Sequence, residues 1–220
     1  MKRFQITILF FLTTLFLQAQ QVITSEELQD LLNSSELPVE NPFITNSSLV
    51  RQIDQANSFT AIQNQQGNLQ NNILVNQNGT SNSGYINQTG AGLETKLWQY
   101  KASNEANLWS EGENINVEVK QDGIGNSINS FIENYFLVSR SAYLLQQGNN
   151  NRIELALFGD AVPSVNNAQQ VEISQTGNDN SVDAMLENTF APISITQTPG
   201  VNGEGMQINI SNSVFAFPMK

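Results

Sequence analysis

The 220-residue chain contains no cysteine and no histidine, and only 13% of its residues are charged. Without cysteine, no disulfide can cross-link the fold and no thiol can act as a nucleophile or metal ligand. Without histidine, the chain lacks the side chain that most often serves as a general base and as a transition-metal ligand. These absences argue against an enzyme, and we expect no catalytic residue, no cofactor and no metal centre.

Positive charge is also scarce, because the chain has 9 Lys and Arg residues against 20 Asp and Glu residues. The formal net charge is −11. Nucleic-acid binding rests on phosphate contacts made by Lys and Arg. We therefore expect no nucleic-acid partner.

Long hydrophobic runs are missing except for one, from Ile6 to Leu17, which follows Lys2 and Arg3. A charged start, an apolar core and a small-residue exit are typical of a secretory signal peptide, here residues 1–20. The alternative is a membrane anchor, but the run is shorter than the ~20 residues that a spanning helix needs. We predict a secreted protein at the cell surface or outside the cell, with no membrane span.

Residues 21–50 are predicted to form a leader. Within it, Thr24 to Leu32 resembles a short capped helix, with Thr24 as the N-cap and Glu27 as its reciprocal partner. Pro38 and Pro42 indicate a linker after it. The leader is either a recognition tag for an export partner or a flexible terminus, and the sequence leaves both open.

What the chain has in abundance is Asn, Gln, Ser and Gly, and the Gln residues are periodic. Beginning at Gln55, every eleventh residue belongs to one repeating frame, and many of these residues are Gln. Two insertions interrupt the frame: three residues before Gln146, and seven residues before Gln175, in the 158–170 loop. Alternate members form a column that is Gln throughout: Gln55, Gln77, Gln99, Gln121, Gln146, Gln175 and Gln197. The intervening column is polar at Gln88 and Ser110 and apolar from Ile132 onward.

The residues around each Gln of this column repeat as apolar-x-Gln-x-Gly-x-x-Asn. Gly suits the positive φ of a tight turn, and Asn is a frequent turn residue. The predicted turn positions are Gly79, Asn82, Asn104, Gly123, Asn126, Gly148, Asn151, Gly177, Asn180 and Asn202. Thr60 occupies the Asn position of the first unit, and Lys101 and Pro199 replace Gly.

Eleven residues accommodate one strand and one turn, so two such units make a coil. We predict an all-β fold, a two-sheet β-solenoid of about seven strand-turn-strand coils over residues 51–210, followed by a tail at 211–220. Stacked coils place like residues roughly 4.8 Å apart, so each buried Gln can hydrogen-bond to the next. Plain disorder is the alternative, but a disordered chain needs none of these registers.

The chain resembles the curlin family, the subunits of bacterial curli amyloid fibres. The resemblance rests on the Gln-x-Gly-x-x-Asn units at 77–82, 121–126, 146–151 and 175–180, and on the eleven-residue return of Gln. It implies export through an outer-membrane secretion pore with export chaperones, and assembly with itself or with other curlin-like subunits into fibres of the biofilm matrix. The irregular second half favours a minor or nucleator-like subunit.

Three further groups of residues could carry a function. Trp109, Phe131 and Met185 fall in one outward column and form a possible lateral contact between fibres, or else are scattered surface residues. Glu111, Glu113 and Glu118 do not form the paired carboxylates of a glycosidase cleft. Acidic and amide residues near Asp179 could bind Ca²⁺ weakly, but turn chemistry explains them better.

The sequence therefore predicts a self-assembling structural protein, with a monomeric β-solenoid adhesin or ligand-binding module as the alternative. It also predicts that ladder Gln residues face inward, whereas Gln63 faces outward.

Overall fold

In the computed structural model, residues 46–64, 69–134, 139–158, 169–185, 193–199 and 204–211 are described. Strands and connecting turns make up this described part, as predicted for an all-β fold. None of its segments is a helix long and apolar enough to span a membrane. The strands are β1 (Asn46–Ile53), β2 (Ser58–Ala61), β3 (Asn71–Thr80), β4 (Ser83–Ile86), β5 (Glu94–Ala102), β6 (Glu105–Ala106), β7 (Ile115–Ile124), β8 (Ser127–Ile128), β9 (Arg140–Gln147), β10 (Arg152–Ile153), β11 (Gln169–Thr176) and β12 (Ile193–Gln197).

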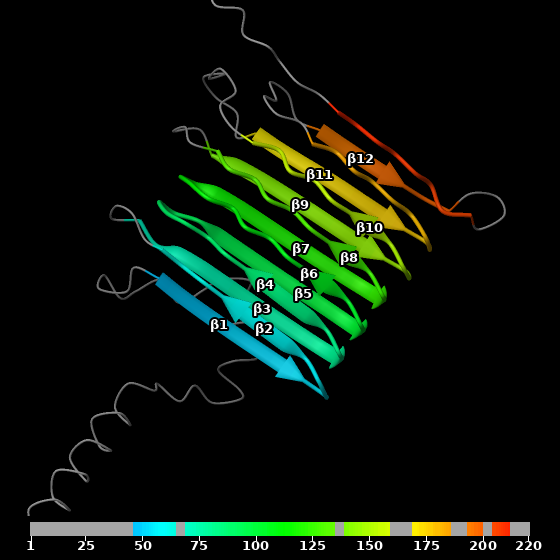
Figure 1. The fold of residues 1–220 in the computed structure, drawn as a ribbon, viewed down its shortest axis with the longest axis horizontal. Helices are drawn as coiled ribbons and strands as arrows, with labels where there is room; N and C mark the ends of the chain where they lie inside the picture. Colours follow the sequence, from blue (N-terminus) through cyan, green and yellow to red (C-terminus); the bar gives the residue numbers. More distant parts are fainter. Residues whose placement is uncertain are drawn as a thin grey trace, which may run out of the picture. The chain divides into compact units, whose positions relative to one another are not determined.

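The strands form two parallel sheets, and the chain alternates between them (Figure 1). The first sheet has seven strands in the order β1-β3-β5-β7-β9-β11-β12, and the second has five in the order β10-β8-β6-β4-β2. Single bridges at Ser181 and Gln207 extend the second sheet beyond β10. The predicted β-solenoid is confirmed, with about five turns that have a strand on both sides.

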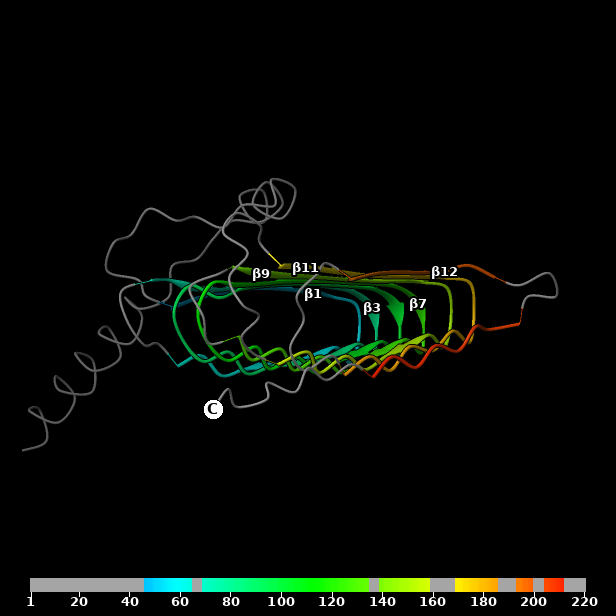
Figure 2. The ribbon, with the colours of Figure 1, turned by 90° about the horizontal axis from the view of Figure 1, so that it is seen from above.

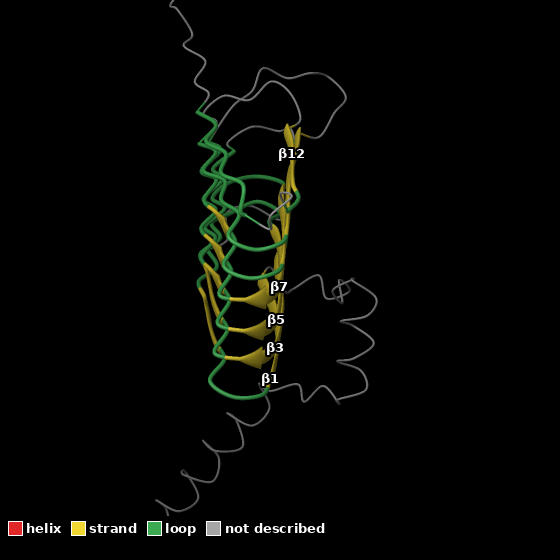
Figure 3. Cartoon of the chain, turned by 90° about the vertical axis from the view of Figure 1, so that its right-hand side faces the viewer, coloured by secondary structure: helices red, strands yellow, loops and turns green. Residues whose placement is uncertain are grey.

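The coils are flat, with the two sheets facing each other as opposite walls (Figures 2 and 3). Along the first sheet, β5 and β7 pair in register from Glu94 opposite Asn116 to Ala102 opposite Ile124. Side chains of a strand alternate between its two faces. The in-register pairing therefore turns each inward position into a column that runs along the solenoid.

The core lies between the two sheets and consists mainly of Ile, Leu and Val. Val119 and Leu144 from the first sheet and Ile128 and Ile153 from the second are at most 1% exposed. β7 shows the expected alternation, with buried side chains at every second position from Ile115 to Gly123. The coils are thin, so each one is stabilised mainly by its neighbours.

The solenoid begins earlier than the sequence predicted. β1 starts at Asn46, within the predicted leader, rather than near Arg51. The signal peptide at 1–20, the helix between Thr24 and Leu32, most of the 158–170 loop and the tail from 212 lie outside the described residues.

Candidate functional site

A continuous row of glutamine side chains, here called the Gln ladder, runs through the interior along the first sheet. In each step, the amide Nε2 of one Gln donates to the Oε1 of the next, and the distances lie between 2.6 and 3.0 Å. The same Nε2 also donates to a backbone carbonyl of the second sheet, as from Gln99 to Ser83 O at 2.9 Å. The members are Gln52, Gln77, Gln99, Gln121, Gln146, Gln175 and Gln197.

A second row, the Asn ladder, runs along the arc that joins the two sheets, and its donors point in the opposite direction. Each Asn donates both its backbone N–H and its Nδ2 to the Oδ1 of the preceding Asn, as from Asn104 to Asn82 at 3.1 and 3.0 Å. Its Nδ2 also donates to the carbonyl of the next arc, as from Asn104 to Gly123 O at 2.9 Å. The members are Asn57, Asn82, Asn104, Asn126, Asn151 and Asn180.

The arc between the two ladders requires left-handed backbone at the predicted glycine. Gly79 and Gly148 have φ values of +131° and +120°. A Cβ on Gly148 would lie 1.9 Å from the carbonyl oxygen of Gly177 in the next coil. Gly is therefore needed both for its conformation and for the close approach of stacked arcs. Lys101 adopts φ of 73° at the same place, so the position tolerates a strained non-Gly residue.

The first rung was predicted incorrectly. Gln52, not Gln55, pairs with Gln77, and Asn57, not Thr60, accepts from Asn82. Gln55 is an exposed residue of the arc. The first coil is 25 residues long rather than 22, and the density of Gln in this region supplied a false match at the shorter spacing.

Gln63 was also predicted incorrectly, because it is partly buried rather than outward-facing. Its Nε2 donates to the carbonyl oxygens of Ser47 and Asn71 at 3.3 and 3.1 Å. The same error of three residues in the first coil explains this difference. With the corrected spacing of 25 residues, Gln63 lies in the same interior column as Gln88, one coil earlier.

At the last rung the arc has a different residue from the one predicted. Asn202 lies outside the described residues. Met206 takes the place of an Asn, because its backbone N–H donates to Asn180 Oδ1 at 3.0 Å. Gln197 Nε2 donates to Met206 O at 2.6 Å, as Gln99 Nε2 does to Asn104 O in an inner coil. The sequence signal was hidden because nine residues, rather than five, separate Gln197 from this position.

The opposite interior column does not form a ladder. Gln88 is fully buried, yet neither its Nε2 nor its Oε1 has a hydrogen-bond partner. The hydroxyl of Ser110, in the next coil of the same column, is buried and unpartnered as well. Buried polar groups without partners lower stability. The two faces of the interior therefore differ, as the sequence predicted.

The two ends of the solenoid leave the apolar interior incompletely covered. Five apolar residues pack against the core but are only partly buried, and all lie in the first or last coil: Phe59, Ala61, Ile193, Ile208 and Ile210. Val50 of β1 is 37% exposed and Met206 is 41% exposed. Among the described strands, the terminal strands β1 and β12 each have a sheet neighbour on one side only. Such edges are templates for further strands.

The predicted outward column is an aromatic stripe. The rings of Trp109 and Phe131 are in contact, with centroids 4.4 Å apart and planes tilted by 60°, and Phe158 packs edge-on to Phe131 at 5.4 Å. Met185 is 55% exposed and lines a hollow of about 190 Å³ together with Phe131. Phe158 was not predicted in this stripe, because the residue spacing places Ala156, and not Phe158, in the column of Trp109 and Phe131.

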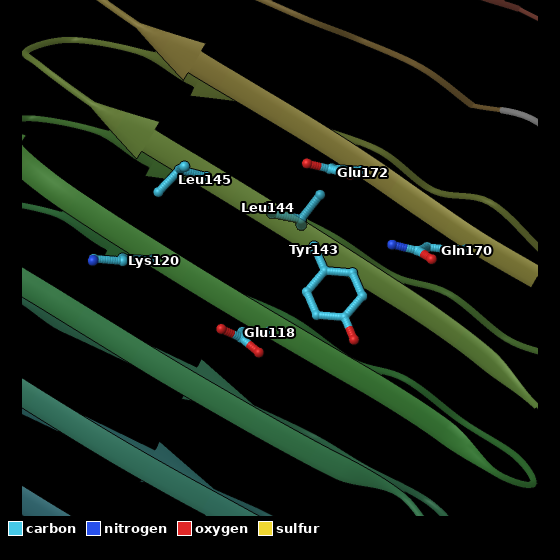
Figure 4. Close-up of a pocket in the computed structure, with 7 residues that line it drawn as sticks. All are labelled: Glu118, Lys120, Tyr143, Leu144, Leu145, Gln170 and Glu172. Atoms are coloured by element: carbon cyan, nitrogen blue, oxygen red, sulfur yellow. The ribbon is translucent and has the colours of Figure 1, made fainter. Parts of the chain in front are cut away.

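The outer face of the first sheet has a shallow hollow of about 380 Å³ (Figure 4). Its outward side chains come from β7, β9 and β11, and they mix acidic, basic, aromatic and apolar groups: Glu118, Lys120, Tyr143, Leu145, Gln170 and Glu172. Nearby, burial and then the charge of Asp122 raise the pKa of Tyr100, and Arg51 opposes this shift.

The described residues contain no group of three or more Asp and Glu side chains arranged to hold a metal ion. Comparison with family models, curated proteins and solved structures finds no match to this chain. The chemistry that these residues do offer is hydrogen bonding between stacked amides and apolar contact at the two ends.

Proposed function

We propose that this protein is a secreted structural protein that self-assembles end to end, or nucleates such assembly, into curlin-like extracellular fibres. In this proposal the chain forms seven coils, of which five have strands in both sheets. The repeat resemblance described above supports export through an outer-membrane pore, with chaperones, and a role in biofilm matrix and adhesion. The same chain could add to itself or to other curlin-like subunits.

The observation that carries the proposal is that, within the described residues, the two ends of the solenoid leave apolar core residues only partly buried and in matching register. Continuing the column positions from β12 to a second β1 places Gln52 over Gln197 and Val50 over Ile195. On the second sheet, it places Phe59 over Ile208. Apolar residues therefore meet apolar residues, and the amide meets an amide.

The free energies of apolar burial and of hydrogen bonding contribute unequally to such a junction. Full burial of a Val, Ile or Phe side chain stabilises by about 1.5–3 kcal/mol, whereas one hydrogen bond contributes roughly 1 kcal/mol net. The apolar residues and the added backbone pairing therefore supply most of the affinity. The Gln ladder supplies the register, because a slip of one residue would bury the outward side chains instead.

The direct test is polymerisation of the purified mature chain, followed by an amyloid-binding dye and by electron microscopy. We expect fibres after a lag, and a shorter lag when fragments of preformed fibres are added. A chain that stays monomeric for days at high concentration, even with added fibre fragments, would contradict the proposal.

The alternative, a monomeric surface adhesin or ligand-binding module, is favoured by one observation, the hollow around Tyr143 (Figure 4). A ligand there would contact an aromatic ring between acidic and amide groups. If the chain stays monomeric and Tyr143→Ala abolishes its adhesion to cells or matrix, this second function replaces the first.

A further inference from the structure

The two ends of the solenoid continue the Gln ladder and the Asn ladder unequally. At the N-terminal end, Gln52 Nε2 donates to Gln77 Oε1, and within the described residues no donor reaches Gln52 Oε1. At the C-terminal end, Gln197 still presents its Nε2 toward the interior, bonded to Ser181 O and Met206 O. An incoming Gln52 Oε1 can replace Met206 O as the acceptor of one of these two N–H groups, which gives the arrangement of Gln77, whose Nε2 donates to Ser58 O and to Gln99 Oε1.

The Asn ladder cannot be continued in the same way. Each Asn needs the Oδ1 of the preceding coil to accept its backbone N–H, as Asn82 N–H uses Asn57 Oδ1 at 3.0 Å. In a second copy stacked on the first, the backbone N–H of Asn57 would face Met206. Its thioether is at most a weak acceptor, so this N–H would have no Oδ1 to which it could donate.

We propose that Met206 sets the strength and specificity of the junction between copies of this chain. The partner is a second copy, joined through the Gln ladder, through Val50 against Ile195 and through Phe59 against Ile208, but without an Asn rung. The junction is then the weakest plane of a fibre, because every inner junction from Asn57 to Asn180 has both ladders. This inference rests on the proposed end-to-end assembly.

The inference predicts a gain rather than a loss from one substitution. Met206→Asn supplies the missing Oδ1 at a position that is 41% exposed, so the new amide is not trapped without water in the single chain. Restoring one hydrogen bond to the otherwise unpaired Asn57 N–H should lower the concentration of soluble chain in equilibrium with fibres about tenfold. Met206→Leu, which has similar volume and no acceptor, should leave that concentration close to the wild-type value.

The experiment polymerises the three full-length mature chains to completion, removes the fibres by centrifugation and measures the soluble remainder. Denaturant unfolding of each chain before polymerisation separates a change in the single solenoid from a change at the junction. A lower soluble concentration for Met206→Asn alone supports the inference. Equal concentrations for all three chains overturn it and leave the proposed assembly intact, whereas an absence of fibres from all three overturns both.

Discussion

At the scale of the residue, the Gln ladder explains how six buried primary amides, from Gln77 to Gln197, are compatible with a stable core. Gln146 is fully buried, and its amide donates to Gln175 Oε1 and Ser127 O while its Oε1 accepts from Gln121. A buried amide without partners would be destabilising. Stacking in register supplies those partners, so each Gln depends on the coils on both sides of it.

Gln146→Ala should therefore lower the free energy of unfolding by about 3 kcal/mol, since the substitution leaves buried groups of Gln121 and of Ser127 unpaired. Gln147→Ala is the matched control, because Gln147 is the next residue, is exposed and faces outward. Denaturant titration of the single chains measures both. Similar losses for the two variants would show that position 146 has no special role in the interior.

At the scale of the element, the second sheet is the weaker wall. Its strands have two to four residues, whereas those of the first sheet have five to ten. On this side of the second and third coils, the inward-facing residues include Gln88 and Ser110, whose side-chain polar atoms lack hydrogen-bond partners. The opposite column thus forms no ladder, and Ser110 is too short to reach the amide of Gln88.

Gln88→Met should stabilise the chain by about 1 kcal/mol, because an apolar side chain of similar length removes two unpaired polar atoms from the core. Gln77→Met is the control, since the same substitution in the Gln ladder removes bonds to Gln52, Gln99 and Ser58. The two variants should shift the midpoint of denaturant unfolding in opposite directions. A loss of stability in both would mean that the amide of Gln88 is satisfied in solution.

The elements also show what could be predicted from sequence. Between Gln77 and Gln121 the spacing is regular, and there the strands, the arcs and both ladders follow from the eleven-residue period alone. The first coil was placed wrongly because Gln52 and Gln55 compete for the same column, and only the pairing of β1 with β3 decides between them. Met206 was missed because a longer arc precedes it, and spacing alone cannot show which residue returns to the column.

At the scale of the whole molecule, the interior columns of the solenoid repeat from coil to coil, and within the described residues its two ends are only partly covered. A closed fold covers its sheet edges, whereas here the residues that only partly cover the core belong to the first and last coils. In the proposed assembly, the same kinds of contact that join one coil to the next also join one copy to another. The central claim is that copies join with β1 of one against β12 of the other, in the register of the Gln ladder.

Disulfide cross-linking between copies tests this claim most directly. The chain has no native cysteine, so only the introduced cysteines can form disulfides. Ser48 and Ile193 belong to one inward column, so across the junction their Cα atoms should lie about 4.8 Å apart, within the range that a disulfide spans. An equimolar mixture of Ser48→Cys and Ile193→Cys chains, polymerised and then oxidised, should give dimers joined through these two positions. The control mixture replaces Ser48→Cys with Leu49→Cys, whose side chain lies on the opposite face of β1 and should give few dimers. Fibres that yield no Ser48–Ile193 cross-link, or yield as much with Leu49→Cys, would contradict end-to-end stacking in this register.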